Sequence, residues 1–366
     1  MGIELEITFR KWVLVVLFCA SGCGGSGPDR VGVPTTDGGA SANFDLAGTD
    51  DAGNAPVDLA GVATTHVAYR LTEDGHVYRV AAVAGAVPED VSAGLTSAGS
   101  DSAVGLSRDG AWLGILTTRF GCGDWSCLAL VATSPTGKSD TTGTLVMAGG
   151  VVVHSEGRPA IARGAAFIVY TADGGAHTRD LWIAHRLAGS DLAFDNPTQL
   201  TVNSAYAIHE LPALSADEQT IVADCEDANG DQTTLCTIGI DGAGADLKGA
   251  TQPLVTLAQG PSGVGNGSEV HSGDFLPDGS LVFEADWMAE QIWRRSGNGA
   301  FAQVAPTFTN DNSPCALPDG RVASLWLERP GNPMGYHELK VMTTTGDYTM
   351  LVTGLDVTDI GLGCGL

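Results

Sequence analysis

Phe275-Leu276-Pro277-Asp278-Gly279 decides the fold, because it is a tight Asp-Gly turn with the apolar segment 281–285 directly after it. Less regular copies of this pattern lie at residues 105–110, 160–164, 213–217, 316–320 and 360–365. The steps between the turn positions, counted from Asp109, are 54, 54, 61, 41 and 45 residues. A repeat of this length that is rich in strands and turns predicts a β-propeller.

Each copy of the repeat unrolls into four short strands, which are β-branched or aromatic runs separated by turn residues. Residues 66–70 and 76–79 supply outer strands without an inner strand before them, and the last copy supplies an inner strand with nothing after it. Pairing the two ends completes one sheet and removes open edges that promote aggregation. We therefore predict an all-β, six-bladed β-propeller over residues 64–366, closed by the N- and C-terminal strands.

The chain is strongly acidic, with 43 Asp and Glu residues against 18 Lys and Arg residues and a formal net charge of −25. A surface of this sign repels the phosphates of nucleic acids, so we exclude a nucleic-acid partner. Cations, basic proteins and sugars stay open as ligands, and solubility alone also explains the charge.

The N-terminus carries a targeting signal. A basic pair at residues 10–11 precedes the apolar residues 12–20, which are too few for a membrane-spanning helix of about 20 residues. The next residues, Ala20-Ser21-Gly22-Cys23, resemble the lipobox of bacterial lipoproteins. The resemblance implies a signal peptide over residues 1–22, a lipid on Cys23, and, because Asp does not follow, the outer membrane of a Gram-negative cell envelope. The alternative is an ordinary secretory signal without a lipid.

Residues 23–63 consist mainly of Gly, Ser, Asp, Ala and Thr. Such a segment cannot bury enough apolar surface to offset the entropy of ordering. We predict that it is a disordered, flexible tether that holds a monomeric propeller away from the membrane, with the lipid as the only membrane contact.

Six cysteines lie beyond Cys23 and form three predicted disulfides. Cys122–Cys127 and Cys225–Cys236 each bracket a hairpin, where facing strands bring the two Cβ atoms within reach. Cys315–Cys364 joins the last two repeats, which are neighbours in a closed ring. Three disulfides fit the oxidising compartment that the leader also predicts, and no Cys-x-x-Cys motif favours a zinc site at these residues.

The repeats resemble those of TolB-type propellers. The resemblance rests on Arg158-Pro159-Ala160-Ile161-Ala162, on residues 167–170, 179–184 and 198–201, and on the Leu-Ser/Pro-x-Asp-Gly turns. In that family, propellers act as protein-binding platforms in the periplasm, and related repeats gate the hydrolase domain of prolyl-oligopeptidase-like enzymes. This sequence has no Gly-x-Ser-x-Gly motif, so we expect no such hydrolase domain.

The residues seven and eight positions before each turn provide candidate ligands at the mouth of the central channel. If the strands align, they form a ring of carboxylates with two histidines, and such a ring repels itself unless a cation or protons neutralise it. Glu210 and His271 are the first choices as ligands or acid–base residues. The alternative is a polar, water-filled channel. The candidates are Asp101, Glu156, His209, Glu210, His271, Asp311 and Asp356.

Two functions follow from these observations. The first is a non-enzymatic binding platform for an envelope protein or glycan, without a cofactor. The second is a metal-dependent, lactonase-like hydrolase that holds a divalent cation at the channel mouth. We expect the first, because no recognisable set of catalytic residues accompanies the anchor and the tether.

Overall fold

The computed structural model describes residues 64–92, 101–123, 126–133, 143–190, 192–228, 233–240, 251–260, 269–287, 290–304, 310–327, 329, 331–332, 334–358 and 361–366. The predicted signal peptide (1–22) and tether (23–63), including Cys23, lie outside these residues. Among the described residues, no helix has the length and apolar composition needed to cross a bilayer.

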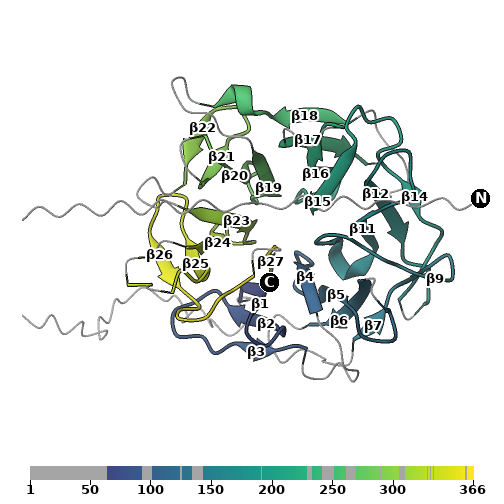
Figure 1. Cartoon of the computed structure of the whole chain (residues 1–366), viewed down its shortest axis with the longest axis horizontal. Helices are drawn as coiled ribbons and strands as arrows, with labels where there is room; N and C mark the ends of the chain where they lie inside the picture. The colour runs from purple at the N-terminus through teal and green to yellow at the C-terminus, as the bar shows by residue number, and fades with distance from the viewer. Residues whose placement is uncertain are drawn as a thin grey trace, which may run out of the picture. The chain divides into compact units, whose positions relative to one another are not determined.

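The described residues form seven sheets (Figure 1). The closing sheet has the strand order β27-β1-β2-β3 and consists of Gly363–Gly365, His66–Arg70, Val77–Ala81 and Glu89–Asp90. Strands β4 to β7 are Asp101–Leu106, Trp112–Thr117, Cys127–Ala132 and Thr144–Leu145. The sheet β10-β11-β12-β14 consists of Ala160–Ile161, Phe167–Ala172, Asp180–His185 and Thr198–Gln199.

Three more four-stranded sheets follow in chain order. Strands β15 to β18 are Ile208–Leu214, Thr220–Glu226, Thr233–Gly239 and Gln252–Val255. Strands β19 to β22 are Val270–Phe275, Leu281–Ala285, Gln291–Arg295 and Phe301–Gln303. Strands β23 to β26 are Asp311–Ala316, Val322–Trp326, Glu338–Met342 and Tyr348–Met350. Two short 3-10 helices, Arg163–Ala165 and Leu257–Gln259, lie between strands.

The prediction of six blades is wrong, because the described residues form an all-β propeller of seven sheets. The additional sheet has the order β13-β8-β9 and consists of Ala193–Phe194, Met147–Ala148 and Val151–Val152. Phe194 belongs to the apolar cluster that joins the β4–β7 sheet to the β10–β14 sheet. Each strand has only two residues. β8 and β9 form a short hairpin across Gly149-Gly150, and β13, which begins 45 residues after β8 ends, pairs with β8 in parallel, a pairing that no local signal in the sequence marks.

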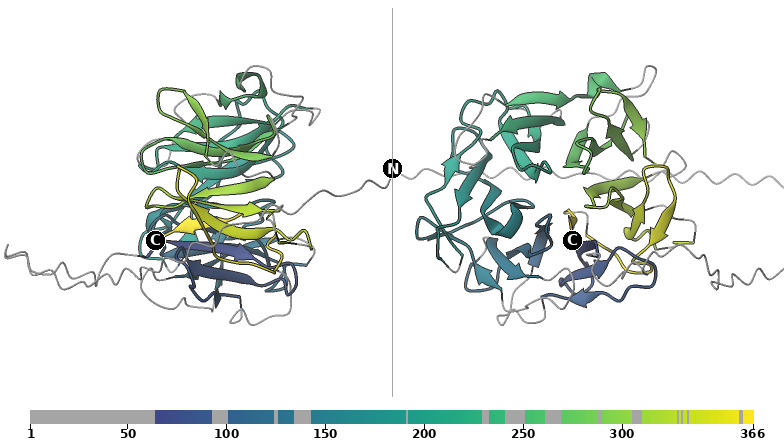
Figure 2. Two further views of the ribbon diagram at one scale, coloured as in Figure 1. Left: turned by 90° about the vertical axis from the view of Figure 1, so that its left-hand side faces the viewer. Right: turned by 180° about the vertical axis from the view of Figure 1, so that it is seen from behind.

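The predicted closure of the ring by the two ends of the chain is confirmed. β27 pairs antiparallel with β1, with Val67 opposite Cys364. The C-terminus therefore lies beside the first strand of the propeller, as both views of the ring show (Figure 1, Figure 2). All three predicted disulfides are present, and Cys315–Cys364 links β27 to the β23–β26 sheet.

The core consists of apolar side chains between neighbouring sheets rather than of one central cluster. The closing sheet packs on the β23–β26 sheet through Tyr69 and Leu325, for example, and both side chains are fully buried. Burial of each such side chain stabilises the fold by roughly 1.5–3 kcal/mol.

Inner strands approach one another closely near the axis of the ring. A Cβ atom on Gly363 of β27 would lie 2.7 Å from the backbone nitrogen of Leu106 of β4. A Cβ atom on Gly105 would lie 2.1 Å from the carbonyl oxygen of Pro159. Only glycine allows this approach, so these two glycines are required for the closed ring.

Candidate binding face at the channel mouth

Five of the seven predicted candidate residues lie where inner strands begin, whereas Glu156 and Asp356 lie in the segments that precede β10 and β27. Asp101 and Asp311 are the first residues of β4 and β23, and His209 is the second residue of β15. The strand register places each of them opposite the last part of the second strand of its sheet. We call this end of the ring the mouth end, and the opposite end, where the Asp-Gly turns lie, the turn end.

Two candidate carboxylates form buried ion pairs within their own sheets. Asp101 is fully buried and accepts hydrogen bonds from Arg119 Nε at 3.0 Å and Thr117 Oγ1 at 2.7 Å. Asp311 pairs with the fully buried Lys340, whose Nζ lies 2.7 Å from its carboxylate. Burial raises the pKa of Asp311 to about 6 and lowers that of Lys340, so desolvation outweighs the attraction between the two charges.

Glu156 and Glu210 share one cation. Arg179 Nε lies 2.6 Å from Glu156 Oε2, and Arg179 Nη1 donates to Glu210 Oε1. Burial raises the pKa of Glu156, and the charges of Asp173 and Glu210 raise it further although Arg179 opposes them. The guanidinium of Arg179 therefore brings the two candidates Glu156 and Glu210 together.

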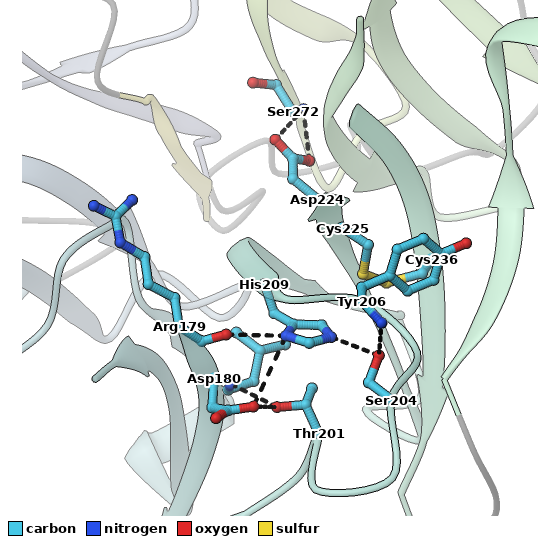
Figure 3. Close-up of a disulfide and its surroundings, with 11 residues drawn as sticks. Arg179, Asp180, Thr201, Ser204, Tyr206, His209, Asp224, Cys225, Cys236 and Ser272 are labelled. Atoms are coloured by element: carbon cyan, nitrogen blue, oxygen red, sulfur yellow. Dashed lines mark hydrogen bonds and ion pairs between the residues drawn. A yellow bond between two sulfur atoms is a disulfide. The ribbon is translucent and has the colours of Figure 1, made fainter. Parts of the chain in front are cut away.

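His209 and Asp356 make local contacts. His209 is fully buried, and its ring nitrogens lie 3.0 Å from the carbonyl oxygen of Arg179 and 2.7 Å from Ser204 Oγ (Figure 3). Burial lowers the pKa of His209. Asp356 accepts a hydrogen bond from the backbone N–H of His337 at 2.8 Å.

His271 belongs to a chain of buried charges that connects two inner strands. Its Nε2 lies 3.0 Å from Glu284 Oε1, and Glu284 Oε2 accepts from the backbone N–H of Ser313 at 2.8 Å. Asp224 accepts in the same way from the backbone N–H of Ser272 at 2.9 Å. A carboxylate on the second strand of one sheet thus holds the inner strand of the next sheet.

These backbone partners lie at strained positions. Ser272 and Ser313 follow candidate positions in β-bulges and have φ angles of 55° and 50°. A non-glycine residue in this region is costly, so the charge-assisted hydrogen bonds from Asp224 and Glu284 stabilise the bulges.

The His271 contacts predict a pH dependence of stability. Burial lowers the pKa of His271, but Glu284 and Asp224 outweigh it and raise this pKa to about 9, above the unfolded value of 6.5. Protonated His271 therefore stabilises the fold below pH 6.5, and this contribution, on the order of 2 kcal/mol, is lost as the pH rises through 9. Urea unfolding at several pH values tests this prediction.

His271→Gln is the matched variant, and it should flatten the stability curve between pH 6.5 and 9. Asp224 contributes in an adjoining range: burial raises its pKa from 3.8 to about 7, so its own contribution to stability is lost as the pH rises from 3.8 through about 7. The slope that belongs to His271 is therefore measured above about pH 8. An unchanged slope in His271→Gln would show that this histidine does not carry the dependence.

The candidate ring thus separates into local ion pairs and hydrogen bonds. Asp101, Asp311 and His209 are buried within the sheets, and the other candidates have partners of opposite charge or polar partners nearby. The chain's own cations neutralise Asp101 and Asp311 one to one, whereas one guanidinium is shared by Glu156 and Glu210.

A second set of acidic residues at the mouth end escaped the sequence analysis. Glu226 is the last residue of β16, and Glu269 and Glu290 flank β19 and β21. Burial and the charges of Glu210 and Glu269 raise the pKa of Glu226. Burial and the charges of Glu284 and Glu269 raise that of Glu290. These like charges interact with one another, so negative charge accumulates at the mouth end, where Glu269 Oε2 also lies 3.8 Å from His271 Nε2.

The channel itself is narrow towards the turn end. A cavity there has room of about 60 Å³, enough for a few water molecules. Arg158 and Asp274 line it, and Arg158 donates to the carbonyl oxygens of Leu362 and Gly273. A substrate of ordinary size does not fit this space.

The seven sheets make this chain a β-propeller. Its three disulfides indicate an oxidising compartment outside the cytoplasm. The chain is similar to the structure of TolB from Acinetobacter baumannii, with a TM-score of 0.58 and 15% identity over 83% of this chain and 67% of that one. It is also similar to Kuenenia stuttgartiensis hydrazine synthase, with a TM-score of 0.52 and 12% identity over 83% and 47% of the two chains.

A structure of puromycin hydrolase aligns at a TM-score of 0.46 and 19% identity, over 83% of this chain and 47% of that one. This chain spans about half the length of the last two structures. No protein-family model and no curated protein matches the sequence. The expected structural likeness to TolB propellers is confirmed, and at these identities the likeness shows the fold alone.

Proposed function

We propose that this chain is a lipid-anchored envelope propeller that acts as a non-enzymatic binding platform, and that its mouth end receives a basic segment of a partner protein. One observation carries the proposal. Asp101 and Asp311 each pair with a buried cation, and Glu156 and Glu210 share Arg179. Glu226, Glu269 and Glu290 add negative charge at the same end. Lys and Arg side chains of a partner would relieve this repulsion.

The hydrolase alternative relied on a ring of carboxylates in need of a metal ion. Buried ion pairs such as Asp101–Arg119 and Asp311–Lys340 remove that need. A glycan remains compatible with a polar mouth, but a neutral glycan would not relieve the repulsion there. We therefore favour a basic protein of the envelope.

The lipid on Cys23 and the signal peptide over residues 1–22 are part of the proposal. They are supported by the lipobox resemblance and by the oxidising compartment that the disulfides indicate. Fractionation of cells that produce the Cys23→Ser variant should move the chain from the membrane to the soluble envelope fraction.

Capture from the envelope extract of the encoding bacterium tests the platform. The full chain and a mouth variant, Glu226→Gln/Glu269→Gln/Glu290→Gln, are compared with a control that removes three acids at the turn end, Asp217→Asn/Asp278→Asn/Asp347→Asn. The variants have equal net charge. The full chain and the control should retain the same protein, and the mouth variant should retain it roughly tenfold less, with capture falling at high salt.

Equal retention by all three chains would contradict the assignment of the mouth end. Capture of a partner whose retention does not change with salt would contradict the basic chemistry that we propose for it.

A further inference from the structure

His177, Asp180 and His209 converge between two sheets at the mouth end. Asp180 is the first residue of β12, His177 precedes it, and His209 lies on β15 of the neighbouring sheet. One donor atom from each residue lies within 4.8 Å of the other two. Figure 3 shows His209 turned towards Asp180 beside the Cys225–Cys236 disulfide. Asp180 and His209 are fully buried, and His177 retains partial contact with solvent.

Both ring nitrogens of His177 face hydrogen-bond acceptors, so a neutral ring can satisfy only one of them. Its Nδ1 lies 2.8 Å from Asp180 Oδ1, and its Nε2 lies 3.2 Å from the carbonyl oxygen of Ser204. Both partners can only accept, and a neutral imidazole carries one N–H group. The ring can donate to the Ser204 carbonyl and, at the same time, face Asp180 favourably in two ways: with a second proton on Nδ1, or with a metal ion bound to Nδ1 and to the carboxylate.

His209 is the second imidazole of the cluster. Its Nδ1 lies 3.0 Å from the carbonyl oxygen of Arg179 and 3.9 Å from Asp180 Oδ1, and its Nε2 lies 2.7 Å from Ser204 Oγ. Both histidines therefore present Nε2 to oxygen atoms of one residue, Ser204, and a metal ion at His209 Nδ1 would have the Arg179 carbonyl oxygen beside it. An imidazole that ligates a metal characteristically donates its other N–H group to a carbonyl or hydroxyl oxygen in this way.

The carboxylate is also oriented as metal ligands usually are. Thr201 Oγ1 donates to Asp180 Oδ1 at 2.5 Å, and the backbone N–H of His177 donates to Oδ2 at 2.9 Å. These bonds fix the carboxylate between the two rings. Two imidazole nitrogens and one carboxylate oxygen form a donor set that suits zinc, with a further position for water or a carbonyl oxygen.

We propose that His177, Asp180 and His209 bind one zinc ion, which connects the β10–β14 sheet to the β15–β18 sheet. The ion supplies the positive charge that the two Nδ1 atoms and the carboxylate share. Its role is structural, because two of its three ligands are fully buried. This site is separate from the acidic face that we assign to partner binding, and it does not depend on that assignment.

Metal analysis of the full chain, purified from zinc-containing medium and dialysed, tests the site. We expect about one zinc per chain, and at least a tenfold lower content in His177→Gln and His209→Gln. His185→Gln is the matched control, since His185 is the last residue of the same strand β12, pairs with Asp195 and lies outside the cluster. Its zinc content should equal that of the unchanged chain.

Two measurements on the unchanged chain keep the test valid if the histidine variants fail to fold. Zinc at about a hundredfold excess over Kd should raise the Tm of chelator-treated chain by about 5 °C. Cobalt should give the visible d–d absorption of a four-coordinate ion. Less than about 0.1 zinc per chain with an unchanged Tm would mean that a proton occupies the site, and the proposal would be wrong.

Discussion

Lys340→Met is expected to lower the free energy of unfolding by about 3–5 kcal/mol, because it leaves the buried Asp311 carboxylate without its counter-charge. Lys340 is fully buried, and its Nζ lies 4.4 Å from the centre of the Trp326 ring as well as 2.7 Å from Asp311. Methionine keeps the apolar stem of lysine and removes the charge. Urea unfolding at neutral pH measures the effect.

The loss of unfolding free energy in Lys340→Met should be smaller at low pH than at high pH. Asp311 already has a raised pKa of about 6 because of burial, and loss of the Lys340 charge raises it further. Protonation removes the buried charge, so the cost of Lys340→Met should shrink as the pH falls towards about 6, and it should stay constant below that pH, where Asp311 is protonated in both chains.

The double variant Asp311→Asn/Lys340→Met is the control for this pair. It removes both charges and should recover at least half of the loss, because the pair pays a large cost of desolvation. A loss below about 1 kcal/mol in Lys340→Met would mean that water reaches the carboxylate.

Removal of the Cys315–Cys364 disulfide is expected to cost about 4 kcal/mol, against about 2 kcal/mol for the Cys122–Cys127 disulfide. The reason is the length of chain that each bond closes in the unfolded state, 49 residues against 5. The variants are Cys315→Ala/Cys364→Ala and Cys122→Ala/Cys127→Ala. Thermal and urea unfolding of both compare the two costs.

The Cys315–Cys364 disulfide also holds β27 in place, and β27 has only three residues. Loss of the bond should therefore lower the cooperativity of unfolding as well as the midpoint. Equal losses in the two double variants would show that β27 stays paired with β1 without the covalent link.

Local patterns in the sequence predicted much of the scaffold. Segment 281–285, predicted from the Asp-Gly turn before it, is β20, because such a turn fixes where the next strand begins. The disulfides followed from the positions of cysteines in hairpins and in neighbouring repeats. The closure followed from incomplete repeats at both ends.

The partners of the candidate residues could not be predicted in this way. Asp311 and Lys340 are 29 residues apart, and Glu284 contacts Ser313 across two sheets. Which base neutralises which acid depends on how neighbouring sheets pack, and a single sequence carries no local signal of that packing. The spacing of His177 and Asp180 was a weak signal, but its meaning depends on His209 from the next sheet.

The seventh sheet was missed for a related reason. Residues 147–148 pair with residues 193–194 across a long separation, and neither segment alternates apolar and polar residues over a length that indicates a strand. Its stability comes from the packing of Phe194 between larger sheets.

The central claim is that the last strand closes the ring beside the first. Peptide mapping of the full chain by mass spectrometry, with digestion under non-reducing conditions, tests it most directly. We predict a linked pair of peptides that contain Cys315 and Cys364, which separate on reduction. A link from Cys364 to any cysteine other than Cys315 would contradict the closed ring.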